Sequence, residues 1–220
     1  VAAGFARLGI GRGDRVALWL PNVPAWLACF FACAQLGAIA VSVNTRFRSH
    51  EVADIVGRSG ARLLVFWPGF KGIDFAGILA ACDAAALARL EQVVAYSEDG
   101  AAPPAAMLGK PCVAYSELTA IAPLEQDFSR PGDGCVIFTT SGTTRAPKFV
   151  MHDQQTLMRH GADVVEGFRI GADSVVLLAP PLCGIFGFCC FMAALIVGFT
   201  RSHCSRDMRG ALALRMFPLG

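Results

Sequence analysis

The stretch RVALWLPNVPAWLACFFACAQLGAIAVSV, residues Arg15 to Val43, joins two strand-like runs through one helix-like run and decides the fold. The first run, Arg15 to Leu20, is rich in residues that favour strands and stops at Pro21. The last run, Ala38 to Val43, has the same character. Two strands connected through a helix are predicted to lie parallel in one sheet.

The middle of this stretch predicts a helix from Ala25 to Leu36. We expect Asn22 to cap its amino end, because an asparagine side chain accepts hydrogen bonds from the first free N–H groups. We expect Gly37 to end it, because glycine readily takes the left-handed conformation at a helix terminus.

The same alternation continues along the chain. The expected elements are a short helix at His50 to Arg58 capped by Ser49, a strand at Ala61 to Phe66, a helix at Ala76 to Leu90, a strand at Gln92 to Tyr96, a strand at Cys135 to Thr139, a helix from about Gln154 to Phe168 and a strand at Val175 to Ala179. Loops are expected at Ser97 to Pro111 and around Pro123 to Gly134. The predicted fold class is α/β, with a parallel sheet flanked by helices on both faces.

Composition restricts the kinds of partner. The chain has 220 residues, of which 55% are hydrophobic and 16% charged, so it has enough apolar material for a real core and is not disordered. Its formal net charge is only +2. Such a balance suggests neither nucleic acid nor an anionic membrane surface as a partner.

A membrane alternative arises from two long stretches without charge, Val16 to Thr45 and Val175 to Thr200. Prolines and glycines divide each stretch into a strand-length and a helix-length piece, too short separately to span a bilayer. Buried parallel strands also read as continuous apolar runs. We therefore expect no membrane span and keep a small membrane protein as the lesser alternative.

Nine cysteines without repeated CxxC spacing predict neither a disulfide framework nor a metal site. Cys29 and Cys33 lie four residues apart, on one face of the predicted helix, among Phe30, Phe31 and Leu36. We expect buried, reduced thiols and a reducing cytoplasm.

The segment TTSGTTRAPK, residues Thr139 to Lys148, follows a predicted strand and is rich in hydrogen-bond donors. Phosphate oxygens need several donors and a positive charge arriving from different directions. Candidate phosphate ligands are the hydroxyls of Thr140, Ser141, Thr143 and Thr144, the close-approaching backbone at Gly142, and the ammonium of Lys148. A plain Ser/Thr-rich turn is the alternative, and the spacing is not the GxxxxGK[ST] of P-loop NTPases.

The string TSGTTRAPKFVMH, from Thr140 to His152, resembles the phosphate-loop signature of the AMP-forming adenylating superfamily. That superfamily includes acyl-CoA synthetases, adenylation domains of peptide synthetases and firefly-type luciferases. Its pattern is Thr/Ser-Gly-Thr/Ser-Thr-Gly-x-Pro-Lys-Gly, and Arg145 and Phe149 stand here in place of its two later glycines. The departure indicates a stiffer, bulkier loop.

Three more segments are similar to the same family: Gly11 to Phe47, Glu51 to Val65, and PPLCGIFGF from Pro180 to Phe188. Cys183 and Gly184 stand where relatives have an aromatic residue and a histidine that shape the acyl pocket and its approach by coenzyme A. His152 is a further candidate for a place near the substrate, with a solvent-facing or helix-capping role as the alternative. No role is expected for His50, His160 or His203.

The resemblance implies part of the large N-terminal domain of an acyl-CoA-synthetase-like enzyme. Its implied substrates are ATP with Mg²⁺, a carboxylic acid of the fatty or aromatic kind, and coenzyme A. Lys148 and the loop hydroxyls would hold the β- and γ-phosphates.

The family's later adenine, ribose and C-terminal catalytic segments are not found, so no residue is assigned as catalytic and the chain is expected to be incomplete for catalysis. We expect a partial AMP-binding domain over residues 1–200 and an atypical, arginine-rich tail over 201–220 that begins at a frameshift or an artificial end. A non-catalytic remnant is the alternative.

Overall fold

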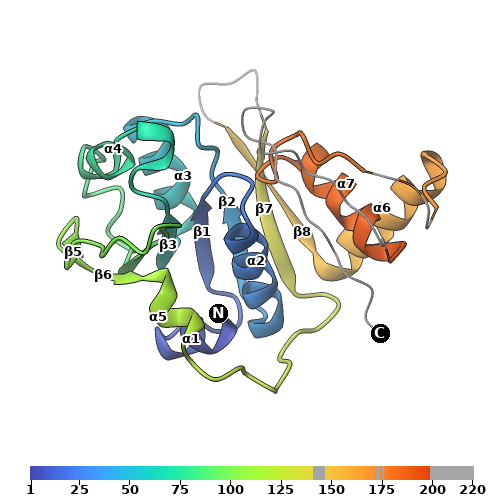
Figure 1. Cartoon of the computed structure of the whole chain (residues 1–220), viewed down its shortest axis with the longest axis horizontal. Helices are drawn as coiled ribbons and strands as arrows, with labels where there is room; N and C mark the ends of the chain where they lie inside the picture. The colour runs from blue at the N-terminus through green and yellow to red at the C-terminus, as the bar shows by residue number, and fades with distance from the viewer. Residues whose placement is uncertain (141–146, 172–173, 175, 199–220) are drawn as a thin grey trace.

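An eight-stranded sheet in the order β5-β6-β4-β3-β1-β2-β7-β8 forms the centre of the molecule (Figure 1). The computed structural model describes residues 1–140, 147–171, 174 and 176–198. Its strands are β1 (Arg15–Trp19), β2 (Ile39–Ser42), β3 (Leu63–Phe66), β4 (Gln92–Ala95), β5 (Ala106–Met107), β6 (Lys110–Ala114), β7 (Gly134–Thr140) and β8 (Lys148–Asp153).

Helices cover both faces of this sheet. They are α1 (Ala2–Arg7), α2 (Pro24–Leu36), α3 (Ser49–Ser59), the 3-10 turn η1 (Phe70–Gly72), α4 (Phe75–Ala80), α5 (Tyr115–Thr119), α6 (Gln154–Gly167) and α7 (Ile185–Ile196). One core contains side chains of α1, α2, α5, α6 and α7, and the other contains those of α3 and α4. The predicted α/β class, with helices on both faces, is confirmed.

The strands are parallel except at the two edges. β1 pairs in parallel with β2 and β3, β3 with β4, β4 with β6, and β2 with β7. The edge pairs β5–β6 and β7–β8 are antiparallel. Leu108 and Gly109, both with positive φ, form the two-residue turn that joins β5 to β6. The loop expected over Ser97 to Pro111 therefore contains one short strand and the start of another.

The central strand β1 shows why the apolar stretches are buried in the core. Val16 and Leu18 point into the core that contains α2, while Ala17 and Trp19 point into the core that contains α3. On the α2 side, the ring of Phe188 in α7 lies 4.8 Å from that of Phe30 and 5.9 Å from that of Trp26. Within the described part of the chain, no helix is long and apolar enough to cross a bilayer.

Both predicted helix caps at the amino ends are wrong. The cap position of α2 is Val23, with Pro24 at the first helical position, and the Asn22 side chain bonds elsewhere. Ser49 is already inside α3, and the N–H of Arg48 donates to the Glu51 carboxylate at 3.0 Å. The carboxylate of the third helical residue accepts from the N–H of the cap residue, as in a capping box, so the cap position falls on Arg48, one residue before Ser49. Gly37 ends α2 with φ 68°, as predicted.

The helix expected over Ala76 to Leu90 is also wrong. α4 ends at Ala80, and turns follow that bury Leu87 and Leu90 in the α3 core. An alanine-rich sequence has high helix propensity, but burial of its leucines overrides that preference. The strand expected over Val175 to Ala179 does not form in its described part, where only Leu177 makes an isolated bridge; Val175 lies outside the described residues.

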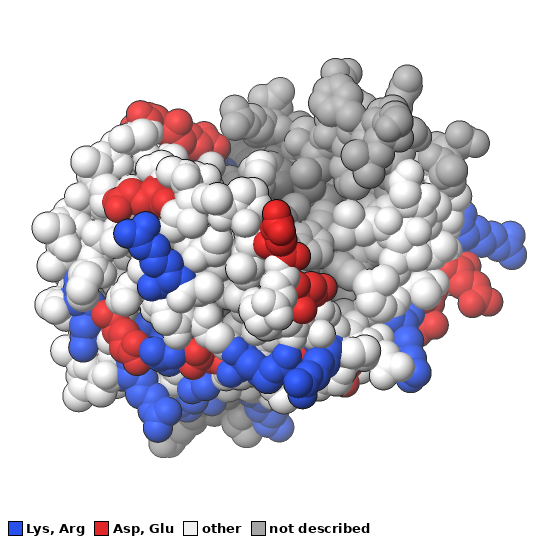
Figure 2. All heavy atoms as spheres, turned by 90° about the horizontal axis from the view of Figure 1, so that it is seen from below, with Lys and Arg blue, Asp and Glu red and all other residues white. Residues whose placement is uncertain are grey.

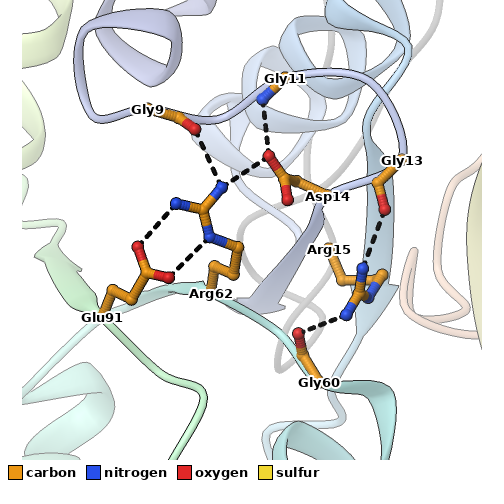
Figure 3. Close-up of polar contacts among 8 residues, drawn as sticks. All are labelled: Gly9, Gly11, Gly13, Asp14, Arg15, Gly60, Arg62 and Glu91. Carbon is orange, nitrogen blue, oxygen red and sulfur yellow. Dashed lines mark hydrogen bonds and ion pairs between the residues drawn. The ribbon is translucent and has the colours of Figure 1, made fainter.

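A polar network ties together the amino ends of β1, β3 and β4 (Figure 3). Arg62 donates to the Glu91 carboxylate at 2.8 and 2.7 Å, to Asp14 at 2.8 Å and to the carbonyl of Gly9 at 3.0 Å. The neighbouring Arg15 donates to carbonyls on both sides of it, including Gly60 at 2.9 Å. Seen from below, basic side chains lie interspersed with acidic ones rather than in a patch of one sign (Figure 2).

Candidate phosphate-binding site

The antiparallel hairpin of β7 and β8 brings Thr140 and Lys148 directly opposite each other. Thr140 is the last residue of β7 and Lys148 the first of β8, and both are exposed. The candidate ligands Ser141, Gly142, Thr143 and Thr144, together with Arg145, lie outside the described residues, and their roles remain predictions. The described part of the site thus places a hydroxyl and an ammonium opposite each other at one end of the β7–β8 ladder.

Strand alternation decides the direction of each side chain in this hairpin. Ile137 belongs to the α3 core, whereas Val136 and Phe138 belong to the α2 core. Thr140 therefore shares the α2 side with Phe138, and Lys148, its partner across the ladder, points the same way. Phe149 points to the opposite side, where it packs on the α3 core.

Arg58, near the end of α3, contacts the start of β8 on that opposite side. Its Nη2 donates to the carbonyl of Pro147 at 2.8 Å, and its guanidinium carbon lies 4.3 Å from the centre of the Phe149 ring. Nε and Nη2 also donate to the two Asp54 carboxylate oxygens, each at 2.7 Å. These hydrogen bonds raise the pKa of Arg58, which is charged at all physiological pH values. Sequence reasoning missed Arg58, because nothing in its local pattern indicates a contact with residues 89 positions away.

His152 lies at the other end of β8. It is four residues from Lys148, about 13 Å along an extended strand. Its ring meets that of Phe138 edge to face, with centroids 6.1 Å apart, and its side chain is half-buried. The helix cap here is Asp153, whose carboxylate accepts from the Thr156 N–H at 2.6 Å. Capping by His152 is therefore not needed, and its place near a substrate remains a prediction.

Cys183 lines a pocket of about 220 Å³ at the carboxyl ends of the central strands. The other walls come from residues 20–22 after β1, residues 44–46 after β2, and Phe70 and Lys71 after β3. α2 joins β1 to β2 over one face and α3 joins β2 to β3 over the other, so this is the point where the sheet reverses its winding. Doubly wound sheets bind ligands at that point.

The chemistry of this pocket is cationic. Arg46 and Lys71 supply two positive charges, and Lys71 holds a left-handed conformation with φ 54° that is unusual for a side-chain-bearing residue. Burial raises the pKa of the Cys183 thiol to about 11, although Arg46 opposes the shift, so the thiol is neutral at pH 7. Cys183 is a lining group here and no ready nucleophile. Gly184 is the cap residue of α7.

Asn22 fixes the segment that carries Cys183. Its side-chain amide donates to the carbonyls of Leu178 at 3.5 Å and Pro180 at 3.0 Å, and its oxygen accepts from the Leu182 N–H at 2.7 Å. Asn22 is buried, so each of these bonds replaces one that water would otherwise make. The predicted cap residue is in fact a clamp between the end of β1 and the segment before α7.

The remaining predicted residues do not gather into a site. Cys29 and Cys33 are buried free thiols, as predicted. Within the described chain, no three His, Cys, Asp or Glu side chains form a group able to hold a metal ion. His50 lies on α3 and His160 on α6, and His203 lies outside the described residues.

Comparison with known proteins agrees with this arrangement. The chain belongs to the AMP-binding enzyme family, whose profile matches residues 1–214. It is 30% identical to 4-coumarate–CoA ligase 4 of Arabidopsis thaliana, over 84% of this chain and 32% of that protein. It is also 30% identical to a feruloyl-CoA synthase of an Amycolatopsis species, over 97% of this chain and 38% of that protein.

Solved structures show the same fold. The inhibitor-bound N-terminal domain of FACL13 from Mycobacterium tuberculosis matches with a TM-score of 0.73 and 26% identity, over 91% of this chain and 46% of that one. Acetoacetyl-CoA synthetase from Streptomyces lividans, at 22% identity, matches with a TM-score of 0.78 over 91% of this chain and 31% of that one. The fold is that of the N-terminal domain of acyl-CoA synthetases. The chain spans about a third of the length of the curated relatives named above.

Proposed function

We propose that this chain is the phosphate-binding part of an AMP-forming acid–thiol ligase, acting on a fatty or aromatic carboxylic acid. The observation that carries the proposal is the pairing of Thr140 with Lys148 on one side of the β7–β8 hairpin, in a chain of the AMP-binding enzyme family. The free, buried thiols support a place in the reducing cytoplasm.

The reaction has two steps. A carboxylate oxygen attacks the α-phosphorus of ATP, and the bond to pyrophosphate breaks to leave an acyl adenylate. The sulfur of coenzyme A then attacks the acyl carbonyl, loses its proton, and displaces AMP. Charge that builds up on the phosphate oxygens has to be offset by preorganised positive groups and donors.

The described residues include a positive group and a donor that could offset charge on the phosphate oxygens in the first step. The Lys148 ammonium is a mobile point charge that can follow a departing pyrophosphate, and the Thr140 hydroxyl donates beside it. Ser141, Gly142, Thr143 and Thr144 would add hydroxyl and backbone donors. Mg²⁺ bound to the phosphates would neutralise part of their charge. The pocket with Arg46 and Lys71 would receive another anionic group of the substrates.

Binding of MgATP to the chain tests the phosphate assignment. We expect Lys148→Ala to weaken MgATP binding at least tenfold, measured by calorimetric titration up to millimolar ligand. Lys110→Ala is the matched control, because Lys110 lies in β6, on the opposite half of the sheet, and its loss should leave the affinity unchanged. Equal affinities of Lys148→Ala and the unaltered chain would refute the assignment.

A second candidate function is a non-catalytic remnant, which the replacement of the two later glycines of the superfamily pattern by Arg145 and Phe149 favours. Carboxylate-dependent exchange between ATP and pyrophosphate separates the two. We expect no exchange from the 220-residue chain and measurable exchange from a longer form that spans the full length of the relatives. Exchange by the chain alone would show that it is complete for adenylation, and its absence from both forms would identify a remnant.

A further inference from the structure

Arg58 is the one side chain for which the structure gives contacts to both neighbours of Lys148, among the described residues. It donates to the carbonyl of Pro147 at 2.8 Å and lies 4.3 Å from the centre of the Phe149 ring. One contact holds the backbone immediately before Lys148, and the other holds the side chain immediately after it. They come from α3, which belongs to a different part of the chain and a different layer of the fold.

The orientation of Arg58 is itself fixed. Asp54, one turn earlier in α3, accepts from Nε and Nη2 in a paired geometry, both at 2.7 Å. The two side chains are 41% and 25% exposed, so the pair adds little to overall stability. The pair fixes the orientation of the Arg58 guanidinium. Because the guanidinium is held at two points, its remaining N–H faces the Pro147 carbonyl and its flat face covers the Phe149 ring.

Phe149 makes this contact possible. The superfamily pattern has glycine at this position, and a glycine offers no ring for a guanidinium to stack on. The phenyl ring packs on the α3 core, and strand alternation then directs Lys148 to the opposite side of the hairpin, toward Thr140. The residue that departs from the pattern thus gains a partner that the pattern does not require.

We propose that Arg58 is a positioning residue, which holds Pro147 and Phe149 so that the Lys148 ammonium is directed toward the phosphate. The inference rests on the proposed function, because it needs Lys148 to bind phosphate. Arg58 itself does not touch the ligand. Arg58 restricts the start of β8 to few orientations before a ligand binds. The entropy cost of ordering this segment on binding is therefore smaller.

A direct attraction between the charge of Arg58 and the ligand is the competing explanation, and two features distinguish them. Direct attraction survives in Arg58→Lys, which keeps the charge, whereas positioning does not, because an ammonium cannot stack on Phe149 and also pair with Asp54 in the same way. Positioning acts through Lys148, so its effect disappears once Lys148 is removed. If the attraction is direct, the loss of affinity caused by Arg58→Ala adds to the loss caused by Lys148→Ala.

The test is a double-mutant cycle on the MgATP affinity of the 220-residue chain. We expect Arg58→Ala and Arg58→Lys each to weaken binding about tenfold, in line with the loss of one charged hydrogen bond and one cation–π contact. Adding Arg58→Ala to Lys148→Ala should change the affinity less than twofold. Arg7→Ala is the matched control, since Arg7 also lies in the last turn of a helix, α1, remote from β8.

Two results overturn the proposal while leaving the phosphate assignment intact: full affinity in Arg58→Lys, or an undiminished effect of Arg58→Ala in the Lys148→Ala background. Full affinity of Lys148→Ala alone overturns both the phosphate assignment and the proposal.

Thermal unfolding checks that each variant is folded. If Arg58→Ala is not, Phe149→Leu replaces it in the cycle, because leucine keeps the apolar packing and removes only the ring; it should weaken binding several-fold, and an unchanged affinity contradicts the proposal.

Discussion

At the scale of single residues, Asn22 shows how tertiary contacts reassign a side chain. Its position after a strand and before a helix predicts a cap, yet Val23 occupies the cap position without using a side-chain bond. The Asn22 amide instead satisfies three backbone groups between Leu178 and Leu182. No sequence pattern near Asn22 indicates that partner, which lies about 160 residues away.

Replacement of Asn22 by alanine should reduce the free energy of unfolding by about 2 kcal/mol, because buried backbone groups would lose their partners. Urea denaturation measures this loss of unfolding free energy. Hydrogen exchange of the Leu182 amide should become faster, because its hydrogen-bond acceptor is removed. Asn44→Ala is the control: the Asn44 side chain accepts one local bond, from the Arg46 N–H at 2.9 Å, and its loss should cost about 0.5 kcal/mol. Similar losses in both variants would mean that the Asn22 clamp contributes nothing special.

At the scale of elements, the residue at position 57 of α3 is restricted by the turns after α4, which pack against it. A methyl group at Gly57 would lie 2.5 Å from the carbonyl oxygen of Ala86, in the turns after α4. The alanine-rich stretch predicts a long helix there, but these turns pass too close to α3 for any residue larger than glycine. The close approach also explains why Leu87 can be buried in the α3 core.

Two opposing effects meet in Gly57→Ala. Helix propensity favours alanine by about 1 kcal/mol, while the clash with backbone costs about 1–3 kcal/mol. We expect the clash to win, with a net loss of about 1 kcal/mol in unfolding free energy. Gly167→Ala in the last turn of α6, where nothing lies within 4 Å, should gain up to about 1 kcal/mol. The opposite order of the two variants in thermal unfolding would contradict this account.

At the scale of the whole molecule, the two cores separate the roles of the sheet's faces. The hairpin of β7 and β8 directs Lys148 to one side and Phe149 to the other, so the proposed phosphate site and the proposed supporting contact from α3 lie on opposite faces. Free thiols are buried in both cores, for example Cys29 and Cys135 in one and Cys82 in the other.

These thiols make stability depend on alkaline pH. Burial raises the pKa of Cys135 to about 12 and that of Cys82 to about 11, from an ordinary 9.0. Between pH 9 and 12 the unfolded chain loses protons that the folded chain keeps, so the free energy of unfolding should fall as pH rises. The slope is at most about 1.4 kcal/mol per pH unit for each such thiol.

Urea denaturation between pH 8 and 11 measures this dependence. Cys135→Ala should have a shallower slope than the unaltered chain, although its stability at pH 8 is lower because a packed sulfur is lost. A slope that is unchanged in Cys135→Ala would show that Cys135 does not contribute to the titration.

The sequence by itself determined the α/β class, the parallel sheet that contains β1, the free thiols and the family, because apolar periodicity and one short signature are local properties. It also placed Thr140 and Lys148 in one candidate loop. Tertiary structure decided what lies far apart in the chain: the antiparallel edge that sets Thr140 opposite Lys148, the reach of Arg58 to Pro147 and Phe149, and the clamp of Asn22. The physical reason is that a side chain's partner depends on which segments burial brings together, and local propensity carries no information about that.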